Sequence, residues 1–176
     1  MIRGGRGGRT PLKNGLWFES RTDLATLLGK LPGYSVKGDS VEFEGKEVAI
    51  LYKKNKIYAN LLVPMGVDYK KVVSKRLLPD DAVLVLVAKT LFIIEAKFQN
   101  VSGSVDEKLQ TCDFKLKQYK KLVEPIGLQV RYAYVLSDWF NQPEYADVLA
   151  YITSVGCDYF FKELPLSYLG LPIPND

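Results

Sequence analysis

The sequence contains no histidine and only two cysteines among its 176 residues. Without histidine the chain cannot form a Ser-His-Asp or Cys-His nucleophilic triad, or a metal site built on imidazole. Cys112 and Cys157 are far apart in the sequence and lack CxxC spacing, so the sequence indicates neither a thiolate metal site nor a disulfide framework. This cysteine usage fits a reducing compartment.

Long apolar runs are also missing. No stretch approaches the roughly 18 apolar residues of a membrane span, and the N-terminus has no apolar signal-peptide core. We therefore expect a soluble, cytoplasmic protein with no membrane association. The composition, 47% hydrophobic and 25% charged, is that of one globular domain, and the net charge of +4 permits a polyanionic partner without requiring one.

The N-terminal segment 1–15 is rich in glycine and arginine and has almost no apolar residues. It predicts a flexible basic arm, followed by a single domain over 16–176. Arg6 and Arg9 are candidates for contact with a phosphate backbone, and an inert disordered tail is the alternative.

Hydrophobic periodicity predicts an α/β domain with one sheet and no internal repeat. Two near-continuous apolar runs, at 81–88 and 90–99, are typical of central strands that are covered on both faces. Ser104 and Glu107 have the spacing of a capping box at the start of a long amphipathic helix. The predicted elements are helices at 16–31, 67–78, 104–123 and after Pro143, and strands within 34–63, at 81–88, 90–99, 128–136 and 157–164.

One constellation of residues carries chemistry. Asp80 follows Pro79 at the start of the first central strand, and the second strand contains Glu95-Ala96-Lys97. Because side chains alternate along a strand, Glu95, Lys97 and Gln99 point the same way. If the two strands pair, the carboxylates of Asp80 and Glu95 converge, as Mg²⁺ requires, with Lys97 placed to assist an attacking water. A plain Glu95–Lys97 salt bridge beside a turn aspartate is the alternative interpretation.

These residues resemble the PD-(D/E)XK nuclease superfamily, with Pro79-Asp80 as the PD element and Glu95-Ala96-Lys97 as the E-x-K element. The resemblance extends to type II restriction endonucleases and implies the restriction-endonuclease-like αβββαβ core, a central mixed sheet flanked by helices. The further segments that carry it are GLWFE at 15–19, LLPDDA at 77–82, IIEAKFQ at 93–99 and GSVDEKLQT at 103–111.

By that resemblance the chain is a Mg²⁺-dependent endodeoxyribonuclease, with Mn²⁺ able to substitute, that cuts double-stranded DNA to leave 5′-phosphate and 3′-hydroxyl ends. Cutting both strands with one site per chain calls for a homodimer. A homing or junction-resolving endonuclease of the same fold remains open, as does a non-catalytic DNA-binding subunit.

The expected roles follow residue by residue. Asp80 and Glu95 would hold the metal, although Asp81 could replace Asp80. The resemblance makes Glu19, on the first predicted helix, a further acid near the metal, and Gln99 is a candidate for orienting water or touching a phosphate. The candidate DNA contacts on and before the helix at 104–123 are Ser104, Lys108 and Lys115, for which a cap and a solvated helix face are the alternatives.

Overall fold

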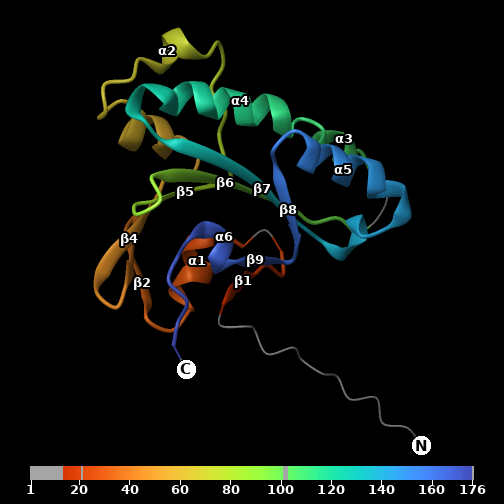
Figure 1. The fold of residues 1–176 in the computed structure, drawn as a ribbon, viewed down its shortest axis with the longest axis horizontal. Coiled ribbons are helices and arrows are strands. Elements are labelled where there is room, and N and C mark those ends of the chain that lie inside the picture. The colour runs from red at the N-terminus through yellow and green to blue at the C-terminus, as the bar shows by residue number, and fades with distance from the viewer. Residues whose placement is uncertain (1–13, 21, 101–102, 176) are drawn as a thin grey trace, which may run out of the picture.

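A computed structural model of the chain describes residues 14–20, 22–100 and 103–175. Within these residues seven strands form one mixed sheet in the order β2-β3-β4-β5-β6-β7-β8 (Figure 1). Neighbours from β2 to β6 are antiparallel, whereas β7 runs parallel to β6 and β8 parallel to β7. The strands are β2 (Tyr34–Lys37), β3 (Ser40–Phe43), β4 (Lys46–Leu51), β5 (Asp81–Val85), β6 (Thr90–Lys97), β7 (Gln129–Leu136) and β8 (Asp158–Phe161). The expected α/β fold with a central mixed sheet is confirmed.

Each face of the sheet is covered by its own set of elements (Figure 1). The face that we call the α4 side packs against α4 (Cys112–Val123), α5 (Ala146–Ser154), α2 (Tyr69–Val72), α3 (Val105–Leu109) and a π-helical turn, η1 (Ile57–Leu62). The opposite face, the α1 side, packs against α1 (Leu24–Gly29), α6 (Leu166–Leu169) and a small antiparallel sheet of β1 (Gly15–Trp17) and β9 (Glu163–Pro165).

The two central strands explain the apolar runs of the sequence. In β5, Ala82 and Leu84 belong to the core on the α4 side, and Val83 and Val85 to the core on the α1 side. All five residues of β5 are buried, and β6 is buried until its last two residues. Both strands therefore need apolar residues at successive positions, as the sequence predicted.

The predicted helix at 16–31 is wrong in its first half. The chain forms β1 there, paired with β9, and α1 begins only at Leu24, after Asp23 accepts a hydrogen bond from the Thr26 amide at 2.8 Å. Leu16 and Phe18 are both buried, which is the two-residue period of an extended chain. Strand β1 starts at Gly15, the last residue of the predicted arm.

Other elements also differ from expectation. The last predicted strand of 34–63 is the π-helical turn η1, and only four residues of the segment 67–78 are helical. The long helix is divided at Gln110 and Thr111, where the Thr111 hydroxyl donates to the Lys108 carbonyl at 2.8 Å. Among the described residues the Ser104 side chain makes no cap hydrogen bond, so the capping box is absent.

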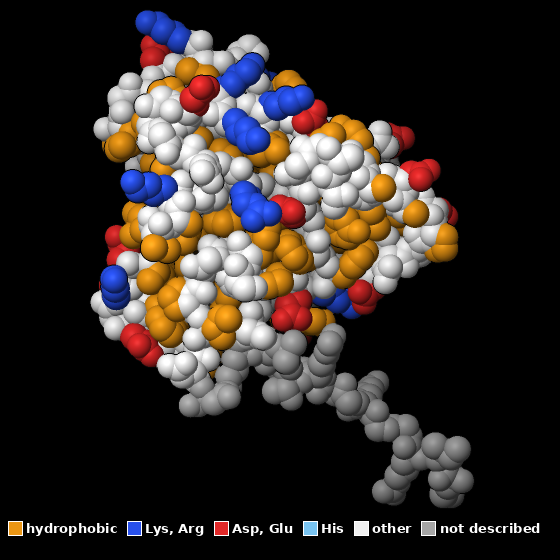
Figure 2. Space-filling model, viewed as in Figure 1, with side chains coloured by type: hydrophobic (Ala, Val, Ile, Leu, Met, Phe, Trp, Pro, Cys, Tyr) orange, Lys and Arg blue, Asp and Glu red, His pale blue; other side chains and the backbone are white. Residues whose placement is uncertain are grey.

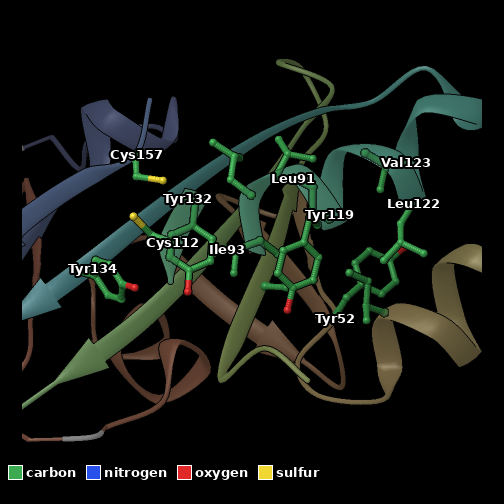
Figure 3. Close-up of a cluster of buried hydrophobic side chains, with 14 of the residues drawn as sticks. Tyr52, Leu91, Ile93, Cys112, Tyr119, Leu122, Val123, Tyr132, Tyr134 and Cys157 are labelled. Atoms are coloured by element: carbon green, nitrogen blue, oxygen red, sulfur yellow. The ribbon is translucent and has the colours of Figure 1, made fainter. Parts of the chain in front are cut away.

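Both cysteines are free and buried in the core of the α4 side. Their sulfur atoms point toward one another (Figure 3), although α4 and the start of β8 are distant in sequence. Within the described ranges, no helix combines the length and apolarity needed to span a bilayer.

Candidate functional site

The pairing of β5 with β6 determines where the predicted acidic residues lie. The two strands are antiparallel, with Asp81 opposite Ile94 and Val85 opposite Thr90. Asp80 precedes β5 by one residue and Glu95 follows Ile94, so the two acids lie one step beyond the last paired residues of the two strands. The register therefore brings the PD and E-x-K elements to the same end of the sheet.

The alternation of β5 distinguishes Asp80 from Asp81. The Asp81 carboxylate points to the α1 side, where its Oδ2 atom accepts a hydrogen bond from the Leu24 amide at 3.3 Å. Glu95 lies on the opposite side and contacts Lys115 of α4. Asp80, one residue from Asp81, is in phase with Glu95 rather than with Asp81. Asp80 is thus the aspartate on the same side of the sheet as Glu95.

Glu95 is a buried carboxylate held between two lysines. Its side chain is 8% exposed, and Lys115 Nζ lies 3.2 Å from Oε1 and 3.3 Å from Oε2. Lys97, two residues along the same strand, places its Nζ 3.6 Å from Oε2. An isolated carboxylate at this depth would carry a large desolvation cost, so the two ammonium groups are required for its burial.

Tyrosine side chains pack close to the same carboxylate. Figure 3 shows Tyr119 and Tyr132 with their hydroxyls pointing to one side of the core, and Tyr134 beside them. Burial raises the pKa of all three phenols, and the charge of Glu95 raises it further. Asp80 adds to the effect on the pKa of Tyr119, consistent with both acids lying on the α4 side. Among the described residues the buried Tyr132 hydroxyl has no hydrogen-bond partner.

Asp80 is more open to solvent than Glu95. Its side chain is 47% exposed, and its Oδ1 atom lies 2.6 Å from Lys54 Nζ. Lys54 sits in the turn that follows β4, where its amide donates to the carbonyl of Pro79 at 2.8 Å. The turn is therefore bound to the residue immediately before Asp80, which holds the Lys54 amine beside the carboxylate.

A cleft of about 260 Å³ opens at this rim of the sheet. Asp80 and Lys54 line it together with residues from the α1 side, including the Lys53–Asp23 pair, whose charged atoms are 3.5 Å apart. Asp81 also lines the cleft, and burial, with a smaller contribution from Asp23, raises the pKa of its carboxyl to about 7. The cleft thus exposes Asp80 and Asp81 to the same space, whereas Glu95 and Lys97 are not among the residues that line it.

Gln99 lies two residues beyond the end of β6. Its backbone is fixed by Ser137, whose hydroxyl accepts from the Gln99 amide at 3.0 Å and donates to the Gln99 carbonyl at 2.9 Å. The Gln99 side chain is buried, yet within the described part of the chain neither amide atom has a hydrogen-bond partner. A buried amide without a partner is suited to form hydrogen bonds with a water molecule or a ligand.

The remaining predicted residues lie outside this group. Glu19 is exposed in a bend after β1, not on a helix, and lines a different cavity with Trp17 and Leu27. Its predicted place on the first helix is therefore wrong. Ser104 and Lys108 are both exposed at α3. Arg6 and Arg9 lie outside the described residues.

Asp80 is therefore paired with Lys54, and Glu95 with Lys97 and Lys115. Lys54 was missed by the sequence analysis, because a lysine in a turn 26 residues before Asp80 gives no signal of its partner. The described chain contains no group of three or more His, Cys, Asp or Glu side chains suited to a metal. Further Lys and Arg side chains gather over α2 and α4 on the face shown in Figure 2.

Comparison with known proteins identified no relative: no family model, curated protein or solved structure matches the chain.

The raised pKa of Asp81 leads to a pH-dependent stability. A carboxyl whose pKa rises on folding stabilises the fold at low pH, and this contribution is lost as pH rises through about 7. Asp81→Asn mimics the neutral form, so its unfolding free energy should exceed that of the wild type increasingly between pH 4 and 8, by up to about 4 kcal/mol.

Urea titrations in the presence of a chelator measure this difference. Asp80→Asn is the control, since it removes only an exposed ion pair worth about 1 kcal/mol or less. A constant difference between Asp81→Asn and wild type across this pH range would contradict the assignment of Asp81 as the titrating group.

The Ser137 hydroxyl should hold the segment that carries Lys97 and Gln99. Ser137→Ala leaves a buried amide and a carbonyl of Gln99 unsatisfied, for an expected loss of about 2 kcal/mol in unfolding free energy. Ser154→Ala is the matched control, because the exposed Ser154 hydroxyl also donates to a backbone carbonyl. Equal losses in the two variants, with unchanged amide hydrogen exchange at Gln99, would rule out this role.

Proposed function

We propose that the chain is a Mg²⁺-dependent endodeoxyribonuclease that hydrolyses phosphodiester bonds of double-stranded DNA, of the restriction type. The observation that carries the proposal is the antiparallel pairing of β5 and β6, which ends at Asp81 opposite Ile94 and so leaves Asp80 and Glu95 at the same end of the two strands, with Lys97 3.6 Å from Glu95. The resemblance of these residues to the PD-(D/E)XK nucleases supports the same conclusion. The further acid expected at Glu19 is not part of the proposal, since Glu19 lines a separate cavity.

The donor set fits a hard divalent cation. Mg²⁺ prefers oxygen ligands and retains several waters, so two carboxylates with open positions around them suffice. Asp80 and Glu95 would hold the ion, and Mn²⁺ takes the same ligands. When bound, the cation would polarise a phosphate oxygen and lower the pKa of water.

Lys97 has the central role among the protein's own groups. Its side chain is only 17% exposed, and its pairing with Glu95 restricts the position of Nζ. We assign it to orienting the attacking water and to neutralising the charge that develops on the phosphate. The water oxygen bonds to phosphorus, the bond from phosphorus to the 3′ oxygen breaks, and that oxygen gains a proton. The products carry 5′-phosphate and 3′-hydroxyl ends.

Gln99 and the basic side chains have supporting roles. The unpartnered Gln99 amide is suited to bind a water or a phosphate oxygen beside Lys97. The exposed lysines of α4 supply a cationic surface for the DNA backbone. Because one chain offers one such site, cutting both strands of a duplex implies two copies acting together as a homodimer.

A second candidate function is a DNA-binding subunit without catalysis. The observation that favours it is that both carboxylates already have lysine partners, which a purely structural network would also show. Titration of Mg²⁺ into labelled duplex DNA separates the two: binding without cleavage at every concentration supports the subunit. A homing or junction-resolving enzyme of the same fold would be identified by its substrate, because discrete plasmid fragments indicate sequence-specific cutting and exclusive cleavage of branched DNA indicates resolution.

Lys97→Ala should reduce the single-turnover rate of plasmid cleavage at least about 100-fold, because it removes a group that acts on the reacting atoms. Duplex binding, measured by fluorescence anisotropy in Ca²⁺, should change less than about threefold, since one phosphate contact at most is lost. Lys37→Ala is the control, as it removes an exposed lysine of β2 that is paired with Glu42 at 2.9 Å. Undiminished cleavage by Lys97→Ala would overturn the proposed active site.

A further inference from the structure

The three lysines that contact Asp80 or Glu95 are not equivalent. Lys97 lies on the same strand as Glu95 and its side chain is 17% exposed, so its position is fixed by β6. Lys115 projects from α4 and is 26% exposed, and Lys54 projects from the turn after β4 and is 55% exposed. The last two approach the carboxylates from separate elements, and both are more exposed than Lys97.

Both of these lysines contact carboxylate oxygens that a divalent cation would need. Lys54 Nζ is 2.6 Å from Asp80 Oδ1, and Lys115 Nζ is almost equidistant from the two oxygens of Glu95. A lysine cannot share a carboxylate lone pair with a metal ion, so cation binding and these ion pairs compete. A cation bound to both Asp80 and Glu95 would therefore displace both Lys54 and Lys115.

We propose that Lys54 and Lys115 are exchangeable counter-ions. They neutralise Asp80 and Glu95 in the metal-free protein, and when a divalent cation takes those oxygens they move to DNA phosphates beside the site. This inference rests on the proposed function and adds to it a mechanism by which metal and DNA bind together.

The charges explain why the exchange is coupled. Without the cation, three ammonium groups face two carboxylates, so the site is only slightly positive and has little attraction for a polyanion. A dication raises the local charge and frees two lysines, which DNA phosphates then neutralise. By linkage, a cation that strengthens DNA binding is itself bound more tightly in the presence of DNA.

The first test measures metal binding without DNA or catalysis. Mg²⁺ is titrated calorimetrically into DNA-free wild type, Lys54→Ala and Lys56→Ala. Lys54→Ala removes the competitor at Asp80 and should bind Mg²⁺ roughly two- to fivefold more tightly, the range expected for an exposed ion pair. Lys56→Ala is the matched control, because Lys56 lies in the same turn and also pairs at 2.6 Å, but with Asp39 instead of Asp80.

The second test measures DNA binding by the same variants in Ca²⁺, with a labelled 30-base-pair duplex at several salt concentrations. Lys54→Ala should bind the duplex more weakly, and the slope of log affinity against log salt should decrease by about one for the lost phosphate contact. Lys115→Ala should likewise bind Mg²⁺ more tightly and the duplex more weakly, and Lys56→Ala should resemble wild type. Because Lys54 has a positive φ of 54°, Lys54→Gly provides an unstrained variant if Lys54→Ala is poorly folded.

The outcomes separate this inference from the proposed function. If wild type binds Mg²⁺ neither alone nor with DNA, the assignment of Asp80 and Glu95 as metal ligands fails. If wild type binds Mg²⁺ but Lys54→Ala binds it no more tightly than Lys56→Ala does, the counter-ion exchange is wrong and the proposed function stands. Tighter metal binding together with weaker duplex binding in Lys54→Ala supports the exchange.

Discussion

The need to compensate a buried carboxylate organises this end of the molecule. Glu95 follows Leu91 and Ile93 on the same face of β6, and like them it is buried. Its charge is tolerated because Lys97 of the same strand and Lys115 of α4 approach it. The crossover helix between β6 and β7 is thus tied electrostatically to the strand that it covers, as well as through the hydrophobic core.

The two aspartates after Pro79 illustrate how one step along a strand separates two environments. Asp81 points to the α1 side, where burial raises the pKa of its carboxyl to about 7. Asp80 remains exposed and paired with Lys54. Adjacent and chemically identical residues therefore differ in environment, with Asp80 exposed beside Lys54 and Asp81 buried beside the start of α1. The cleft at the rim of the sheet is lined by both.

Much of the local structure was predictable because the physical signal is local. The central strands were recognised from the uninterrupted apolar runs that burial on both faces requires, and the grouping of Glu95, Lys97 and Gln99 followed from strand alternation. Predictions were wrong for short apolar segments whose pattern fits more than one kind of secondary structure. Leu16 and Phe18 fit a strand as well as a helix. The capping spacing at Ser104 did not produce a cap because Ser104, with φ −83° and ψ 10°, lacks the extended backbone of an N-cap residue.

The sequence by itself determined which chemical groups the chain possesses and the periodicity with which they repeat, since both are properties of neighbouring residues. It excluded histidine chemistry and marked Asp80, Glu95 and Lys97 as a candidate set. Only the tertiary structure decided that Asp80 rather than Asp81 is in phase with Glu95, that Lys54 and Lys115 are their partners, and that Glu19 lies elsewhere. Those relations depend on strand register and on packing between distant segments, which local patterns do not encode.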